Sequence, residues 1–173
     1  MHPVLDIQAG KFNTFSGKVV DIMNPTVDMI DSRDIAMGLS NNCRWGGQCN
    51  HFYSLAQHSI YVATMAPAGL EPEALIHDAS EAYLGDVIKP LKVILGKVYA
   101  DIEEKWMRVI CSKYGVDYNR LELIKEYDIA ALVHEFDYFF KGERQCAEFH
   151  NILSNKRTVY EGFLNVWNAT FPS

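Results

Sequence analysis

The sequence predicts an all-α protein, a compact bundle of helices preceded by a short irregular or hairpin segment. Beyond residue 54 the apolar residues recur at intervals of three and four, which is helical spacing. No stretch alternates strands with helices, so a parallel sheet is not expected. Of the 173 residues, 49% are hydrophobic and 22% are charged, which suffices for one sizeable core. We therefore expect residues 1–173 to form a single domain.

The first part of the chain predicts extended structure and one short helix. Residues 12–30 mix β-branched residues with Gly and Pro, which favours a short hairpin with its turn near Asn24-Pro25. Asp31 or Ser32 is suited to cap a short helix that follows.

The remainder predicts a loop and then a series of helices. Residues 41–50 contain two glycines and no periodicity, as in a loop. Pro72 suits the first turn of a helix, and Gly85 and Gly115 suit helix ends. The expected helices cover residues 55–66, about 72–84, 87–95, 97–114, 119–140 and about 158–168.

Charge and composition limit the partners. A net charge of −6 argues against binding a nucleic acid polymer, but not against a small phosphorylated ligand. No apolar run approaches 18 residues and no signal-peptide pattern is present, so we expect a cytoplasmic protein without a membrane partner. The four cysteines form no CxxC pair, so we expect reduced thiols.

The adjacent pair His77-Asp78 on an apolar helix is the strongest functional signal. Burying an unpaired polar group costs roughly 1–3 kcal/mol, and a divalent metal satisfies imidazole and carboxylate together. His58 lies on the preceding helix, and Asp128 interrupts an apolar stripe on a later one. Each residue alone would more often be structural, but the combination predicts a metal site formed by His58, His77, Asp78 and Asp128. Four ligands leave positions for water and substrate on a five- or six-coordinate ion, as in a catalytic site.

These residues resemble the H…HD…D signature of HD-domain metal-dependent phosphohydrolases. The stretch YSLAQHSIYVATMAPAGLEPEALIHDASEAYLGDVIKPL resembles the core of the nucleotide-cleaving branch. The upstream RWGGQ segment is similar to bacterial 5′-deoxynucleotidases and bacteriophage dATP triphosphohydrolases within that branch. The resemblance covers roughly residues 15–140 and implies an HD-domain helical bundle.

Two further carboxylates are the expected catalytic residues. Glu81 lies one helical turn from Asp78, where it can hydrogen-bond a metal-activated water or accept its proton. Asp86 follows the helix end and is suited to hold a second cation or to protonate the leaving oxygen. The resemblance implicates both residues in catalysis.

A set of cationic and polar residues is the expected substrate-binding group. Lys125 shares a helix face with Asp128, and Arg44 suits a bidentate phosphate contact. The resemblance favours Lys92 over Lys89, which we expect to be a surface charge, and implies nucleotide contacts for Arg44 and its aromatic neighbour. For Trp45, base stacking and core packing are equally compatible with the sequence. The expected substrate contacts are Arg44, Trp45, Gln48, Lys92 and Lys125.

The most specific expectation is a dNTP triphosphohydrolase that prefers dATP and releases deoxynucleoside and triphosphate. A 5′-deoxynucleotidase acting on dNMPs, a non-catalytic nucleotide-binding module, a structural helical protein and hydrolysis of other phosphate esters remain alternatives. The ligand set suits Zn²⁺, Mn²⁺ or Co²⁺, with Mg²⁺ as a candidate second ion. The resemblance also implies a homo-oligomer, a dimer or larger.

Overall fold

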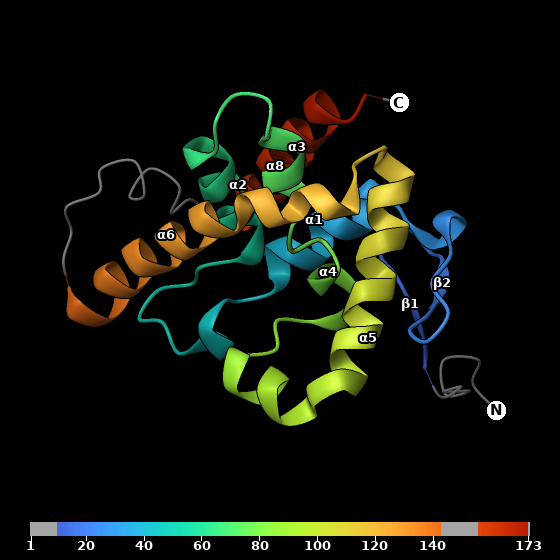
Figure 1. The fold of residues 1–173 in the computed structure, drawn as a ribbon, viewed down its shortest axis with the longest axis horizontal. Helices are drawn as coiled ribbons and strands as arrows, with labels where there is room; N and C mark the ends of the chain where they lie inside the picture. The colour runs from blue at the N-terminus through green and yellow to red at the C-terminus, as the bar shows by residue number, and fades with distance from the viewer. Residues whose placement is uncertain (1–9, 143–155, 173) are drawn as a thin grey trace.

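The computed structural model describes residues 10–142 and 156–172. These residues form a compact, mostly helical structure with one small two-stranded sheet (Figure 1), which confirms the helical class expected from the apolar spacing. No helix in the described ranges is long and apolar enough to cross a membrane.

The N-terminal hairpin is present, but its turn was predicted at the wrong place. Strands β1 (Lys11–Asn13) and β2 (Val19–Asp21) pair antiparallel, and the Thr14 N–H donates to the Lys18 carbonyl across the turn. Gly17 supplies a positive φ of 86° there, which proline cannot adopt. Asn24-Pro25 instead follows β2 and leads to the 3-10 helix η2 (Val27–Met29).

The next segments bring the glycine loop against helix α2. Asp31 caps α1 (Ser32–Asn41) by accepting from the Arg33 N–H, as expected. The 3-10 turn η3 (Trp45–Gly47) lies in the predicted loop, and α2 (Leu55–Met65) confirms the helix expected at 55–66. An antiparallel bridge between Cys43 and Ser54 closes the loop, so its residues lie beside the start of α2.

The helix predicted at 72–84 is broken into two. The short helices α3 (Glu71–Ile76) and α4 (Glu81–Leu84) are joined by a tight turn in which the Glu81 N–H donates to the Asp78 carbonyl at 3.0 Å. Gly38 on α1 lets α4 approach so closely that a Cβ there would lie 2.8 Å from the Ala82 Cα. The turn keeps helical backbone angles at His77 and Ser80, and it carries His77 and Asp78.

Helix α5 (Lys89–Tyr114) joins the two helices predicted at 87–95 and 97–114. The expected break is present as a local interruption, because Gly96 has non-helical angles of φ 59° and ψ −140°. Gly115 ends the helix in the left-handed conformation, as predicted. Figure 1 shows the first part of α5 bent away from the longer second part.

The long helix predicted at 119–140 consists of three types of helix in succession. A 3-10 helix η4 (Tyr118–Ile124) precedes α6 (Lys125–Phe136), and a π-helical turn η5 (Asp137–Lys141) follows. Periodicity alone does not distinguish these neighbouring helical forms. The last helix is α8 (Lys156–Thr170), slightly longer than predicted.

The main core joins the hairpin to the helices. It is centred on contacts of α1 with α8, α4 and α2, and the buried Trp167 and Phe163 of α8 pack within it. Trp106 of α5 lies in the same core and donates from Nε1 to the Ile22 carbonyl after β2. A second cluster lies between α2 and α6, so α2 is held from both sides.

Candidate metal centre

His58 is completely buried on the second turn of α2. Ser54 and Gln57 form a capping box at the start of that helix, which fixes the first turn. The His58 Nδ1 donates to the Glu135 carboxylate at 2.6 Å. Because Nδ1 carries the proton, the lone pair of Nε2 faces the cavity and is available to a metal.

His77 is oriented in the same way by a backbone group. Its Nδ1 donates to the Ala74 carbonyl at 2.7 Å, and its Nε2 lies 3.3 Å from the Nε2 of His58. Asp78 Oδ2 lies 3.3 Å from His77 Nε2 and 3.6 Å from His58 Nε2. The turn between α3 and α4 therefore directs the side chains of His77 and Asp78 toward the Nε2 atom of His58.

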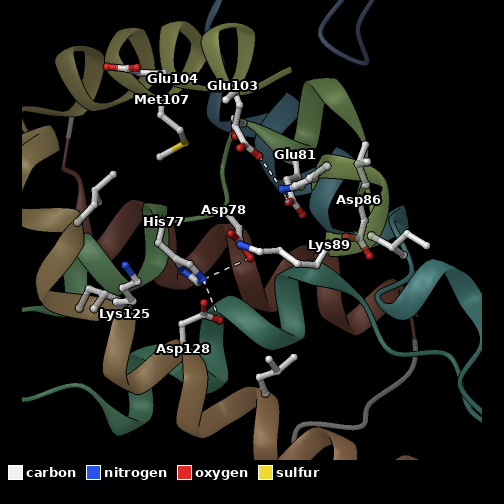
Figure 2. A pocket seen from close by; sticks show the side chains of 18 of the residues that line it. His77, Asp78, Glu81, Asp86, Lys89, Glu103, Glu104, Met107, Lys125 and Asp128 are labelled. Carbon is white, nitrogen blue, oxygen red and sulfur yellow. Dashed lines mark hydrogen bonds and ion pairs between the residues drawn. The ribbon is translucent and has the colours of Figure 1, made fainter. Parts of the chain in front are cut away.

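Asp128 on α6 completes the cluster. Its Oδ1 lies 3.0 Å from His58 Nε2 and 3.8 Å from His77 Nε2, and Figure 2 shows its carboxylate directed at His77 and Asp78. Two donor atoms about 2.1 Å from one ion lie about 3.0–3.5 Å apart. His58, His77 and Asp128 thus have the spacing and donor types to hold a metal ion, and Asp78 borders the same point.

Electrostatics at the cluster suit a cation. Burial alone lowers the pKa of His77, but Asp78 and Asp128 raise it to about 9. Burial raises the pKa of the Asp78 carboxyl, yet the charges of His77 and Arg44 leave it well below its ordinary value. The carboxylates therefore remain ionised and favour positive charge between them.

Glu135 is the main residue that sequence reasoning missed. It is fully buried on α6 and accepts hydrogen bonds from His58, from the Tyr53 hydroxyl at 3.0 Å and from Arg44 Nε at 3.1 Å. Its position seven residues after Asp128, two helical turns along the same face, was the available signal. This carboxylate is a second layer that orients His58.

Arg44 reaches the site from the glycine loop. Its backbone N–H donates to the Tyr53 carbonyl, which fixes the loop beside α2. Its guanidinium lies between Glu135, at 3.1 Å, and Asp78 Oδ2, at 3.6 Å. The side chain borders the cavity as predicted, but its charge is already matched by two carboxylates.

The other two loop candidates differ in position. Trp45 packs against Phe140 and Phe136, with ring centroids 5.1 and 6.1 Å away, as the packing interpretation expects. It also borders the cavity, and base stacking there stays a prediction. Its φ of 61° is unusual for a bulky residue and marks local backbone strain. Gln48 is exposed and is not among the described residues that line the cavity, so its predicted substrate contact does not fit this geometry.

The cluster lies at the wall of a cavity of about 920 Å³, between α5, η4 and α6. Glu81 is buried there, and burial together with Asp78 raises its pKa to about 8, although Lys92 opposes this. Asp86 also lines the cavity, and burial raises its pKa as well. Both predicted catalytic carboxylates thus lie on the same cavity as the histidines.

The predicted phosphate-binding lysines are engaged with carboxylates. Lys92 Nζ lies 2.7 Å from Glu81 and 2.6 Å from Glu103, and Lys125 Nζ lies 3.1 Å from Glu122. The sequence did not indicate the Lys92 pairs, because Glu81 and Glu103 each lie 11 positions away. Glu122 is only three residues before Lys125, a local spacing that the sequence analysis did not consider. These ion pairs make Lys92 a structural partner of Glu81 in this geometry rather than an open phosphate ligand.

Comparison with known proteins identifies relatives of the chain. It is 42% identical over 122 residues to the uncharacterized protein YfdR of Escherichia coli K12, an alignment that covers 70% of this chain and 68% of YfdR. It is 36% identical over 110 residues to the uncharacterized protein RCAP_rcc00048 of Rhodobacter capsulatus, covering 58% of this chain and 56% of that protein. No protein-family model matches the sequence. The chain therefore belongs to the family of the Escherichia coli protein YfdR.

Proposed function

We propose that the protein is an HD-domain, metal-dependent phosphohydrolase that acts on deoxynucleotides. The convergence of two imidazole nitrogens and two carboxylate oxygens at the wall of a large cavity carries the proposal. A structural metal site would be closed by its ligands, whereas this group borders open volume. When bound, a divalent ion would supply Lewis-acid chemistry and a water of lowered pKa.

The residues of the chain have distinct tasks in this reaction. Glu135 and the Ala74 carbonyl hold the two histidine rings so that each Nε2 faces the site. Glu81 accepts a proton next to Asp78, and Lys92 holds its carboxylate in place. Asp86, on the same cavity wall, is placed to return a proton to the leaving oxygen.

The preferred substrate class is the dNTPs, with dATP first, and the products are deoxynucleoside and triphosphate. The size of the cavity accommodates such a ligand. A 5′-deoxynucleotidase acting on dNMPs is the second candidate, and a specific observation favours it. Arg44, Lys92 and Lys125 were expected to neutralise a triphosphate, but each is already paired with carboxylates.

The decisive experiment is a product analysis. Purified protein is incubated with Mn²⁺, Co²⁺, Zn²⁺ or Mg²⁺ and with every dNTP, dNMP and matching ribonucleotide, and the products are separated by chromatography. Deoxyadenosine and intact triphosphate from dATP are expected. Nucleoside and orthophosphate from monophosphates alone would establish the second candidate, and no turnover of any of these nucleotides would overturn the proposal.

The His77→Ala variant provides the control for that experiment. It should lose both bound metal and turnover, because it removes one of the two imidazole ligands. Full activity in this variant would exclude the cluster as the reaction centre. The expected homo-oligomer remains a prediction that light scattering of the purified protein tests.

A further inference from the structure

The cavity has an excess of negative charge, which sets a requirement for any phosphate ligand. Its lining includes seven carboxylates and four lysine or arginine side chains. An ion at the histidines would offset Asp78 and Asp128, but not the remaining acids. A phosphoryl group therefore needs a cation that is not already neutralised by the protein.

Three of the four cations already have a carboxylate partner, which is buried for Arg44 and Lys92 and exposed for Lys125. Arg44 is paired with Glu135 and Asp78, Lys92 with Glu81 and Glu103, and Lys125 with Glu122. Moving Arg44 or Lys92 to a ligand would leave a buried carboxylate, Glu135 or Glu81, without its cation. Such a loss is costly in a low-dielectric environment.

Lys89 differs from the other three. It lines the cavity at the first residue of α5, and no described residue forms an ion pair with it. Figure 2 shows its side chain extending into the cavity rather than away from it. Pro90 follows Lys89 in the first turn of α5, and its ring restricts the backbone of both residues.

We infer that Lys89 is the residue that binds the phosphoryl group of the substrate. This inference rests on the proposed function and replaces the sequence expectation that Lys89 is only a surface charge. Figure 2 shows the Lys89 side chain extending toward Asp78, so its ammonium would form a charge-assisted contact to a phosphate oxygen held near the metal centre. The ligand class is a phosphate ester or polyphosphate held jointly by this lysine and the metal centre.

Binding of tripolyphosphate to Mn²⁺-loaded protein, measured by calorimetry, tests this inference without turnover. Lys89→Met should weaken binding about tenfold or more, because a charge-assisted contact is lost. Lys97→Met is the matched control, since it removes the same charge from an exposed lysine of α5 that is paired with Asp101. Its affinity should equal that of the wild type, and Lys89→Arg should retain most of the binding.

The outcomes separate the two proposals. Equal tripolyphosphate affinity for Lys89→Met and the wild type, with unchanged KM for the nucleotide, would overturn the role of Lys89 and leave the phosphohydrolase standing. If Lys89→Met and Lys97→Met lose the same tripolyphosphate affinity, the effect comes from net charge alone. That outcome would also overturn the role of Lys89. A wild-type protein that neither binds tripolyphosphate nor hydrolyses nucleotides would overturn the proposed function, and the inference with it.

Discussion

At the scale of single residues, Glu135 links the parts of the site that come from different elements. Its carboxylate is shared by His58 of α2, Arg44 of the glycine loop and Tyr53 before α2. Burial raises the pKa of this carboxyl, but His58 and Arg44 lower it below its ordinary value. The three hydrogen-bond donors therefore compensate the ionised Glu135 carboxylate for the hydration that it loses inside the protein.

Glu135→Gln should weaken metal binding by about 10–100-fold, because a neutral amide replaces the charged acceptor that orients His58 and raises the basicity of its Nε2. The measurement is a competition titration of the purified protein with Zn²⁺ and a chelator, with circular dichroism to verify folding. Glu126→Gln, an exposed change on the same helix, removes the same charge and should leave the affinity unchanged. Equal affinities for both variants would contradict the orienting role.

Metal binding should release close to one proton from His77 at pH 7. Its pKa of about 9 in the metal-free protein means that the ring is protonated there, and a proton on Nε2 competes with the ion. Affinity should therefore rise with pH up to about 9 and fall about tenfold per pH unit below it. Calorimetry in buffers of different ionisation enthalpy measures the released protons, and a pH-independent affinity would contradict the assignment.

At the scale of elements, the close approach of α4 to α1 positions Glu81 and the turn before it. The Asn42 side chain donates to the Glu81 carbonyl at 3.0 Å, and Gly38 of α1 faces the backbone of Ala82. No side chain larger than hydrogen fits at Gly38 without moving α4. This packing holds α4, which directly follows the turn that carries His77 and Asp78.

Gly38→Ala should lower the free energy of unfolding by about 2–3 kcal/mol, because the added methyl meets rigid backbone. Gly162→Ala is the matched control on α8, where a Cβ meets nothing within 4 Å. It should raise the free energy of unfolding by about 0.5–1 kcal/mol through helix propensity. Urea unfolding measures both, and a Gly38→Ala protein as stable as the wild type would refute the close contact.

At the scale of the whole molecule, the candidate metal centre joins segments that are far apart in sequence. His58 lies on α2, His77 and Asp78 on the turn between α3 and α4, and Asp128 on α6. Figure 1 shows α6 lying along the molecule and the second part of α5 crossing its direction. An ion bound at this junction stabilises the folded state because the unfolded chain does not hold its ligands together.

Metal addition should therefore raise the melting temperature. At 100 times its dissociation constant, an ion adds about 2.7 kcal/mol to the free energy of unfolding. For a chain of this size that corresponds to an increase of about 5–10 °C. Differential scanning calorimetry with and without EDTA measures the shift, which His77→Ala should abolish and His51→Ala, an exposed histidine, should retain.

The sequence by itself determined the helical class, the capped helix α1, the helix α2 and the set of residues that converge on one point. Local signals suffice for these features, because helical spacing, caps and the improbable burial of His and Asp are properties of short segments. Glu81 and Asp86 were predicted to lie near the metal site because they are close to Asp78 in the sequence, and both line the same cavity as Asp78.

Only the tertiary structure decided that Arg44 and Lys92 are paired with carboxylates. Arg44, Lys92 and Lys125 all looked like open cations in sequence, and Lys89 looked like the least informative one. Packing brings together side chains that are far apart in the sequence. Arg44 and Glu135, for example, are separated by 91 positions and form an ion pair. The break between α3 and α4 was also not predicted, and the backbone of Ala82 just after it lies against Gly38 of α1.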